Sequence, residues 1–478
     1  MNRFQKASFL LGPLVWLICF LVKKNIPDSN LIVVLGIAFW MILWWISEVV
    51  PIYVTALLPM VLFPASNIFS IKETFHPYAN PVIFLFMGGF IIALAMESRK
   101  LHMRIALNLI KITGTKPTGI ILGFTISTAF LSMWISNTAT AVMMLPIALS
   151  VINLLKQDKE SEEYKKFGLA LMLSIAYAAN IGGTMTLIGT PPNVVFAGFL
   201  LERYQIEIGF GDWMLIGVPF GLLMLSVMYF LLTKGLIKIK LPKIDGAQNL
   251  ISTELKGLGK MQNAEKMVLF VFVLTALLWM FKGQVNDLVF GSPVLNNTSI
   301  AMLGGLLMFC LPINLKSGEF LLSWKETKDL PWGILLLFGG GLSMASALES
   351  VGAIDIIGSY VANNLSVSIF ILVAVLATIG VFATEFISNV ALVTVLLPVV
   401  FGIGDKLGVN AFELTIPVVL AASCAFMMPI STPPNAVVYS SGQIKINQMI
   451  RVGFVLNIAT ILLLSTVIYW LVNFVFGG

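Results

Sequence analysis

Long, continuous apolar segments are the feature of this sequence that most restricts its fold. They recur from end to end, for example in residues 31–46 (LIVVLGIAFWMILWWI), 267–281 (MVLFVFVLTALLWMF) and 452–472 (VGFVLNIATILLLSTVIYWLV). Several approach the roughly 20 residues that a helix needs to cross a bilayer. Because the segments are apolar throughout and do not alternate, they predict helices and not a membrane β-barrel. The sequence therefore predicts an all-α polytopic membrane protein.

Composition and charge agree with a membrane protein. Apolar residues make up 58% of the chain and charged residues 11%, whereas a soluble domain has roughly 25% charged residues. A topology with the N-terminus inside and the C-terminus outside puts 23 of the 29 Lys and Arg residues on the cytoplasmic side. This bias follows the positive-inside rule, so the net charge reflects topology and does not indicate a nucleic-acid partner. We predict a multi-pass protein of the plasma membrane.

The second half of the chain repeats motifs of the first half in the same order. Residues 86–98 (FMGGFIIALAMES) align with 338–350 (FGGGLSMASALES) at an offset of 252. Residues 187–193 (LIGTPPN) align with 429–435 (PISTPPN) at an offset of 242. A Gly-Gly pair alone would be a weak signal, because small residues commonly mark close helix packing. Several motifs at coherent offsets indicate a duplication.

The charge pattern predicts that the two copies have opposite orientations in the membrane. The loop at 156–166 is rich in Lys, whereas the corresponding region of the second copy has almost none. Inverted repeats with helix breaks at corresponding places are typical of secondary transporters. We therefore divide the chain into a first helix (1–30), a first inverted repeat (31–235), a cytoplasmic linker (236–266) and a second inverted repeat (267–478).

Each predicted repeat contains two polar interruptions. ISNTATAVMMLP (135–146) and ISNVALVTVLLP (387–398) interrupt apolar segments whose two flanks lie on the same side, which predicts two re-entrant hairpins with Ser-Asn at the tips. The two TPPN breaks place prolines inside segments that cross, where a helix cannot continue. Unpaired backbone groups cost several kcal/mol in hydrocarbon, so such breaks persist only where they are buried in protein or line a cavity.

The four breaks predict binding sites for ions of both signs. Each joins a helix C-terminus, which attracts cations, to a helix N-terminus, which attracts anions. The pattern therefore predicts two cation sites and one shared anion site between the repeats. Neither Lys nor Arg occurs in the four motifs, and an uncharged, oxygen-rich ligand set suits a hard cation such as Na⁺.

A carboxylate lies close to the second hairpin tip. Glu385 stands three residues before Ser388, and its counterpart in the first half is Met133. An acidic residue inside a membrane is a functional candidate by default. The sequence leaves two interpretations open, a structural, paired group and a proton site.

At these motifs the chain resembles the divalent anion:sodium symporter family, the sodium-coupled di- and tricarboxylate transporters, from about residue 30 to the end. The resemblance implies about eleven transmembrane helices, two re-entrant hairpins, a homodimer, and elevator-like movement of a transport domain against a scaffold. It implies two Na⁺ sites, one formed by Ser132, Ser136, Asn137 and Gly189, and one by Thr384, Ser388, Asn389 and Ser431.

The resemblance also implies a set of substrate contacts. The residues that would meet the substrate are Asn137, Thr138, Thr190, Pro191, Asn389, Val390, Thr432 and Pro433. Val390 stands where the family motif has Thr. This removes one hydroxyl near the substrate and makes the two carboxylate contacts unequal.

The leading functional hypothesis is Na⁺-coupled symport of a C4 dicarboxylate such as succinate, malate or fumarate, with two or more co-transported Na⁺ ions. The alternatives are a Na⁺-independent dicarboxylate exchanger and a transporter of citrate or another divalent anion. An anion channel would lack saturable, Na⁺-dependent uptake. A membrane-embedded hydrolase would need a nucleophile with a base or a metal cluster, and no His, Asp or Cys lies beside these serines. We therefore predict that the protein is not an enzyme.

Overall fold

A computed structural model describes residues 1, 3–23, 30–154, 161–241, 244, 246–364 and 368–477. Residues 156–160 of the predicted basic loop at 156–166 therefore lie outside the described residues. The described chain is almost entirely helical, with one short antiparallel pair of strands, β1 (Pro312–Asn314) and β2 (Glu319–Phe320). Ten of its helices are long and apolar enough to cross a membrane. The predicted all-α polytopic class is confirmed.

The elements of the first half follow one another with short connections. They are α1 (Arg3–Lys23), α2 (Asn30–Ser47), α3 (Ile52–Thr55), α4 (Leu58–Ala65), α5 (Ile71–Phe75), η1 (His76–Ala79), α6 (Pro81–Ser98), α7 (Leu101–Ile112), α8 (Pro117–Ser132), α9 (Asn137–Leu154), α10 (Glu162–Thr184), α11 (Pro191–Tyr204), α12 (Phe210–Phe230) and η3 (Leu231–Gly235).

The remaining helices belong to the linker and the second half. They are α13 (Ala247–Gly257), α14 (Asn263–Met280), α15 (Lys282–Val285), η4 (Asn286–Phe290), α16 (Asn297–Cys310), η5 (Trp324–Asp329), α17 (Trp332–Ser350), α18 (Ala353–Asn364), α19 (Ile369–Ala383), α20 (Asn389–Leu407), α21 (Ala411–Ala422), α22 (Pro433–Tyr439), α23 (Ile446–Leu463), η6 (Leu464–Ile468) and α24 (Tyr469–Phe476).

The linker is more structured than its polar composition predicts. Residues 247–257 form the helix α13, which packs against α7. The next helix begins at Asn263, before the expected boundary at 267, because Gln262 and Glu265 form a capping box.

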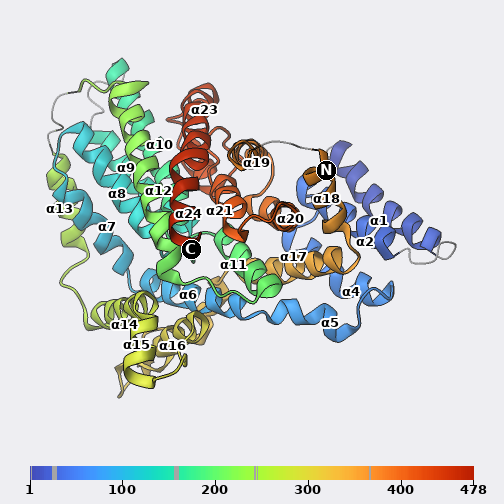
Figure 1. Cartoon of the computed structure of the whole chain (residues 1–478). Coiled ribbons are helices and arrows are strands. Elements are labelled where there is room, and N and C mark those ends of the chain that lie inside the picture. The colour runs from blue at the N-terminus through green and yellow to red at the C-terminus, as the bar shows by residue number, and fades with distance from the viewer. Residues whose placement is uncertain are drawn as a thin grey trace.

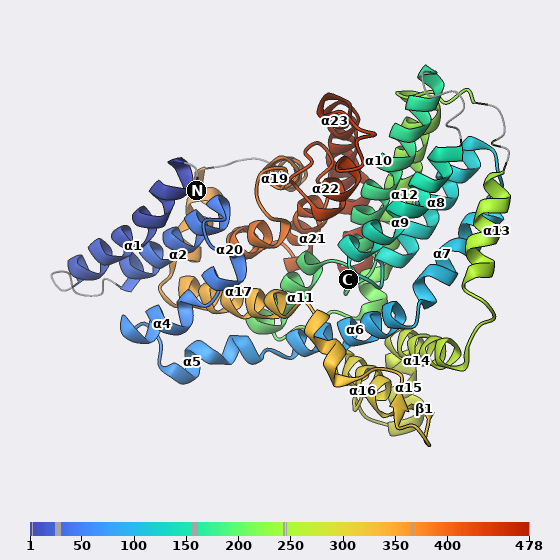
Figure 2. The same cartoon turned by 180° about the vertical axis from the view of Figure 1, so that it is seen from behind.

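The helices form two groups that meet along one side of the molecule. One group contains α2 to α6 and α14 to α17, in which α6 packs against α16 and α14, and α17 against α2, α4 and η1. The other contains α8 to α12 and α19 to α24. Figures 1 and 2 show α4 to α6 and α14 to α16 along the lower side, with α8 to α12 and α19 to α24 above them. We call these the lower group and the upper group.

Two almost completely buried helices form the centre of the upper group. All but the first residues of α10 are buried, and so is nearly all of α21. Each packs between the two arms of one hairpin, α10 against α8 and α9, and α21 against α19 and α20. A helix that is apolar on all sides belongs in such a position, because every face meets protein.

The repeated Gly-Gly pairs explain how the lower group is packed. A Cβ atom at Gly88 would lie 2.5 Å from the carbonyl oxygen of Ala301, and one at Gly340 would lie 2.7 Å from the Cβ of Ala56. The first glycine of each pair therefore lets its helix approach another segment of the lower group closely, α16 at Gly88 and the turn between α3 and α4 at Gly340.

The second glycine of each pair faces the upper group. A Cβ at Gly89 would lie 3.3 Å from Cδ1 of Ile188, in the loop between α10 and α11. A Cβ at Gly341 would lie 3.2 Å from Oγ1 of Thr394, on α20. The two glycines occupy corresponding positions in the sequence but contact different parts of the upper group.

Candidate cation and anion site

Two helical hairpins carry the Ser-Asn motifs at their turns. Helix α8 ends at Ser132 and α9 begins at Asn137, while α19 ends at Ala383 and α20 begins at Asn389. Ser136 accepts a hydrogen bond from the backbone N–H of Ala139, 3.2 Å away, as an N-cap does. The turns lie at the predicted positions, because polar side chains replace the missing backbone partners there.

The first hairpin contributes to a compact group of oxygen atoms. Ser132 Oγ lies 2.6 Å from Asn137 Oδ1 and 2.8 Å from the carbonyl oxygen of Ala179 on α10. A Cβ at Gly183 would lie 2.6 Å from Asn137 Oδ1 and 3.1 Å from the Gly189 carbonyl oxygen. The structure thus brings together Ser132, Asn137 and Gly189, three of the four residues predicted for the first cation site.

The second hairpin has a similar arrangement, although its backbone carbonyl lies one residue later in the repeat than that of Ala179. Thr384 Oγ1 lies 2.7 Å from Asn389 Oδ1 and 2.6 Å from the carbonyl oxygen of Ala422 on α21. Thr384 is fully buried. Ser388 is the N-cap of α20 without a side-chain capping bond. Ser431 Oγ lies in the adjacent loop and donates to the Met428 carbonyl oxygen at 2.7 Å.

In each of the two groups of oxygen atoms, there are more hydrogen-bond acceptors than hydroxyl protons to satisfy them. A hydroxyl carries one proton and can donate it to only one acceptor at a time. In each half, one hydroxyl faces both an amide oxygen and a backbone carbonyl oxygen at 2.6–2.8 Å. A small cation stabilises such converging oxygens, and hard cations prefer them. Among the described residues, no three His, Cys, Asp or Glu side chains gather as a metal-binding cluster.

The asparagines of the TPPN breaks hold the unwound backbone, a role that we did not predict. Asn193 Nδ2 donates to the carbonyl oxygens of Gly183 and Thr186, at 3.3 and 2.8 Å. Asn435 Nδ2 donates to those of Ala425 and Met428, at 3.0 and 3.1 Å. The offset of 242 relates all three positions in the two halves. The TPPN motif could have indicated this role, since an Asn follows the two prolines in both halves.

Helix α10 joins the two halves at the site. The Ala179 carbonyl belongs to the first oxygen group, and the next residue, Asn180, reaches the second half. Asn180 Nδ2 donates to Thr432 Oγ1 at 3.0 Å and to the Ala425 carbonyl oxygen at 3.2 Å. Helix α22 packs against α9 and α10, and α11 packs against α20 and α21. The repeat pattern did not indicate Asn180, because its counterpart in the second half is Ala422.

The residues predicted to meet the substrate differ in exposure. Thr138 and Pro433 are exposed, Asn137, Asn389 and Pro191 are half-buried, and Thr190 and Thr432 are buried as the N-caps of α11 and α22. Val390 is only 8% exposed, although it corresponds to the exposed Thr138. The two halves are therefore unequal at this position in burial as well as in chemistry.

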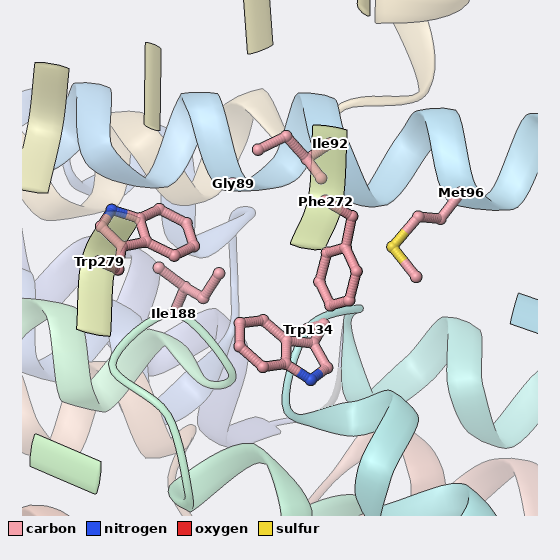
Figure 3. Close-up of a pocket in the computed structure, with 7 residues that line it drawn as sticks. All are labelled: Gly89, Ile92, Met96, Trp134, Ile188, Phe272 and Trp279. Carbon is pink, nitrogen blue, oxygen red and sulfur yellow. The ribbon is translucent and has the colours of Figure 1, made fainter. Parts of the chain in front are cut away.

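An apolar cleft separates the first hairpin turn from the lower group. Trp134 packs edge-on against Phe272 of α14, with ring centroids 4.9 Å apart. Figure 3 shows Trp134 and Ile188 facing α6 and α14 across this cleft. Its lining residues are Gly89, Ile92, Met96, Trp134, Ile188, Phe272 and Trp279. The counterparts of Trp134 and Ile188 in the second half, Phe386 and Ile430, are 68% and 77% exposed.

Paired hairpins and paired helix breaks in a bundle of membrane helices define a membrane transporter, and comparisons with known proteins agree. The chain belongs to the family described as the sodium:sulfate symporter transmembrane region, which it matches over residues 8–476. This confirms the resemblance to the divalent anion:sodium symporters and the prediction of Na⁺ co-transport. The protein is a transporter and not an enzyme.

Relatives and solved structures of transporters are similar to almost the whole chain. The sodium-dependent dicarboxylate transporter SdcS of Staphylococcus saprophyticus is 40% identical over 100% of this chain and 93% of its own length. SdcS of Staphylococcus aureus (strain USA300) is 37% identical over 99% of this chain and 92% of its own.

Two solved structures share the fold. The YdaH transporter of Alcanivorax borkumensis has a TM-score of 0.58 at 14% identity, over 84% of this chain and 87% of that one. MtrF of Neisseria gonorrhoeae has a TM-score of 0.54 at 11% identity, over 86% of this chain and 84% of that one.

Proposed function

We propose that the protein is a Na⁺-coupled symporter of C4 dicarboxylates that works by an elevator-type movement. The observation that carries this proposal is the doubled oxygen group at the hairpin turns, in which Ser132 and Thr384 each face an amide and a carbonyl oxygen. Two similar, uncharged groups of this kind suit two Na⁺ ions. Relatives named sodium-dependent dicarboxylate transporters, at 37–40% identity, support the substrate class.

The anion would bind between the two cation sites. Asn137 and Thr138 from the first half, and Asn389 and Thr432 from the second, offer amide and hydroxyl groups to two carboxylates. Lys and Arg do not occur in the four motifs, so the positive charge that binds a dianion comes from the Na⁺ ions and the helix N-termini. Binding of Na⁺ and substrate is therefore mutually dependent, with a coupling of about 1–3 kcal/mol.

A competition experiment tests the substrate class. Radiolabelled succinate uptake into proteoliposomes is measured in Na⁺ while unlabelled malate, fumarate, citrate and sulfate compete. We expect malate and fumarate to compete at concentrations similar to succinate, and citrate and sulfate to compete weakly. Sulfate is the important control because the family description contains it. Strong competition by sulfate or citrate alone would replace the C4 assignment by another divalent anion.

The two halves of the upper group contact the lower group through residues at different positions in the repeat, and this difference, which we call their register, supports the elevator movement. Ile188, which faces the lower group, is 8% exposed, whereas its counterpart Ile430 is 77% exposed. Conversely, Thr394 faces the lower group at 4% exposure, whereas its counterpart Val142 is 52% exposed. Thr394 lies five residues after the start of α20 at Asn389, about 7.5 Å along the helix axis. In an alternative state with the registers exchanged, Ile430 and Val142 would meet the lower group.

Cysteine pairs test this exchange in a background without Cys19, Cys310 and Cys424. The pair Ile92→Cys and Ile188→Cys tests the arrangement in this structure, since both residues line the same cleft. Met344→Cys with Ile430→Cys is the pair related to it by the repeat offsets. We expect each pair to cross-link with a short bifunctional reagent and to stop transport when it does. A transporting protein in which the second pair never cross-links would contradict the exchange.

We further propose a homodimer in the plasma membrane, with the N-terminus inside and the C-terminus outside. The distribution of Lys and Arg over the loops supports the orientation. The predicted inverted repeats, with the first over 31–235 and the second over 267–478, depend on this orientation. Because the oxygen groups are built within one chain, each protomer would contain a complete site.

A further inference from the structure

Glu385 is a buried carboxylate whose partners are three consecutive backbone amides. It lies next to Thr384 in the turn between α19 and α20 and is 1% exposed. Its oxygens accept hydrogen bonds from the N–H groups of Phe426, Met427 and Met428, at 2.9, 2.9 and 3.0 Å. Asn457 Nδ2 of α23 donates a fourth bond at 2.8 Å. The ion pairs formed by the described residues do not include Glu385.

These bonds explain why the second TPPN break is longer than the first. In the first half, α10 continues to Thr184, and residues 185–190 separate it from α11. In the second half, α21 ends at Ala422, and residues 423–432 separate it from α22. The break is longer by four residues, about one helical turn. Amide groups that would otherwise bond within the helix bind the carboxylate.

The first half has no equivalent carboxylate. Position 133, the counterpart of Glu385, is Met. There the Met133 backbone carbonyl accepts a hydrogen bond from the Thr186 hydroxyl. The first break is therefore held by a neutral contact, whereas the second is held by a group that can carry a full negative charge.

The segment that Glu385 holds lies between Ala422 and Ser431, which both contribute oxygens to the second cation group. The carbonyl oxygen of Met428 accepts from Ser431 Oγ at 2.7 Å and from Asn435 Nδ2 at 3.1 Å. The carbonyl oxygen of Ala422, where α21 ends, faces Thr384 Oγ1 at 2.6 Å. The carboxylate thus fixes the backbone on which these oxygens lie. Its charge is weakly screened in this buried place and favours a nearby cation.

We propose that Glu385 is the positioning residue of the second cation site. It keeps the last turn of α21 unwound, orients the oxygens of that site, and makes the second site bind Na⁺ more tightly than the first. This inference rests on the proposed Na⁺ coupling. It makes the two sites unequal in affinity although their ligand groups are similar.

The test uses Glu385→Gln, which keeps the shape and removes the charge, and Glu385→Met, which installs the residue of the first half. Na⁺ binding is read without substrate, as the thermal stability of the purified full-length protein against Na⁺ concentration, with choline replacing Na⁺. The half-saturating Na⁺ concentration should rise roughly tenfold or more in both variants. Should they fail to fold, Asn457→Ala removes one of the four donors and should shift the same value less, in the same direction.

Double variants separate a positioning role from a general loss of stability. The effect of Glu385→Gln on Na⁺ affinity should be non-additive with Thr384→Val, since both act on one site, and additive with Ser132→Ala at the other. An unchanged Na⁺ dependence, or coupling to Ser132 instead of Thr384, would overturn the inference. Failure of succinate uptake with normal Na⁺ binding would instead count against the proposed substrate, so the two failures are distinguishable.

Discussion

Replacing Thr384 by valine tests the cation site with a change of one functional group. The side chain keeps its β-branched shape and loses only the hydroxyl. That hydroxyl is fully buried and lies 2.7 Å from Asn389 Oδ1 and 2.6 Å from the Ala422 carbonyl oxygen. Valine therefore removes one oxygen ligand from the second site and leaves the other two in place.

The expected effect on Na⁺ follows from the energy of one bond to a charged group. Such a bond contributes about 1.5–3 kcal/mol, which corresponds to roughly a ten- to hundredfold change in affinity. We expect Thr384→Val to raise the half-saturating Na⁺ concentration by this factor. The fold also loses stability, by about 1–3 kcal/mol, because the Ala422 carbonyl is left without this partner.

Thr378→Val is the matched control on the same helix. Among the residues that the structure describes, the Thr378 hydroxyl bonds only to the Ala374 carbonyl oxygen of its own helix, at 2.6 Å. Succinate uptake into proteoliposomes is measured against Na⁺ concentration for both variants and the parent. The control should keep the parental Na⁺ curve. A parental curve for Thr384→Val, or an equal shift in Thr378→Val, would refute the assignment of this oxygen group to Na⁺.

Three further predictions concern the asparagines of the hairpin turns, Val390 and the membrane topology. Asn137→Ala and Asn389→Ala should each reduce uptake at least roughly tenfold while the protein stays folded and inserted; near-normal uptake by both would reject the site. Val390→Thr should change the succinate KM by less than about threefold, because the side chain is 8% exposed; a larger change would mean that it meets the substrate. Lys256→Cys, on α13, should be labelled only from the cytoplasmic side of sealed cells, and external labelling would contradict the topology.

The sequence predicted the fold class and the hairpin turns because both depend on local pattern. Apolar segments must become helices in a membrane, and the Ser-Asn turns lie at the positions that the polar residues indicate. The resemblance implied Na⁺ ligands at Ser132 and Thr384. That role stays a prediction, although each hydroxyl lies in one of the two oxygen groups. Their third member, a backbone carbonyl of α10 or α21, has no sequence signature, since every residue has a carbonyl group.

Other parts of the site could not be predicted because they depend on contacts between distant segments. The partners of Glu385 are backbone amides 41–43 residues away, so its sequence context showed a carboxylate but not what holds it. Asn180 lies in an apolar helix and has no polar counterpart in the second half, yet it bonds to Thr432, 252 residues away. The burial of Val390 depends on how α20 packs, whereas the motif predicted a residue facing the substrate.

Succinate accumulation driven by an imposed Na⁺ gradient tests whether the protein is a Na⁺-coupled symporter. Proteoliposomes loaded with K⁺ are diluted into Na⁺ or K⁺ medium that contains radiolabelled succinate. Symport predicts uphill accumulation only with the inward Na⁺ gradient, with a rate that rises sigmoidally with Na⁺ concentration because two cation sites must fill. Succinate entry at the same rate in K⁺ medium, together with counterflow that does not need Na⁺, would contradict symport and establish an exchanger.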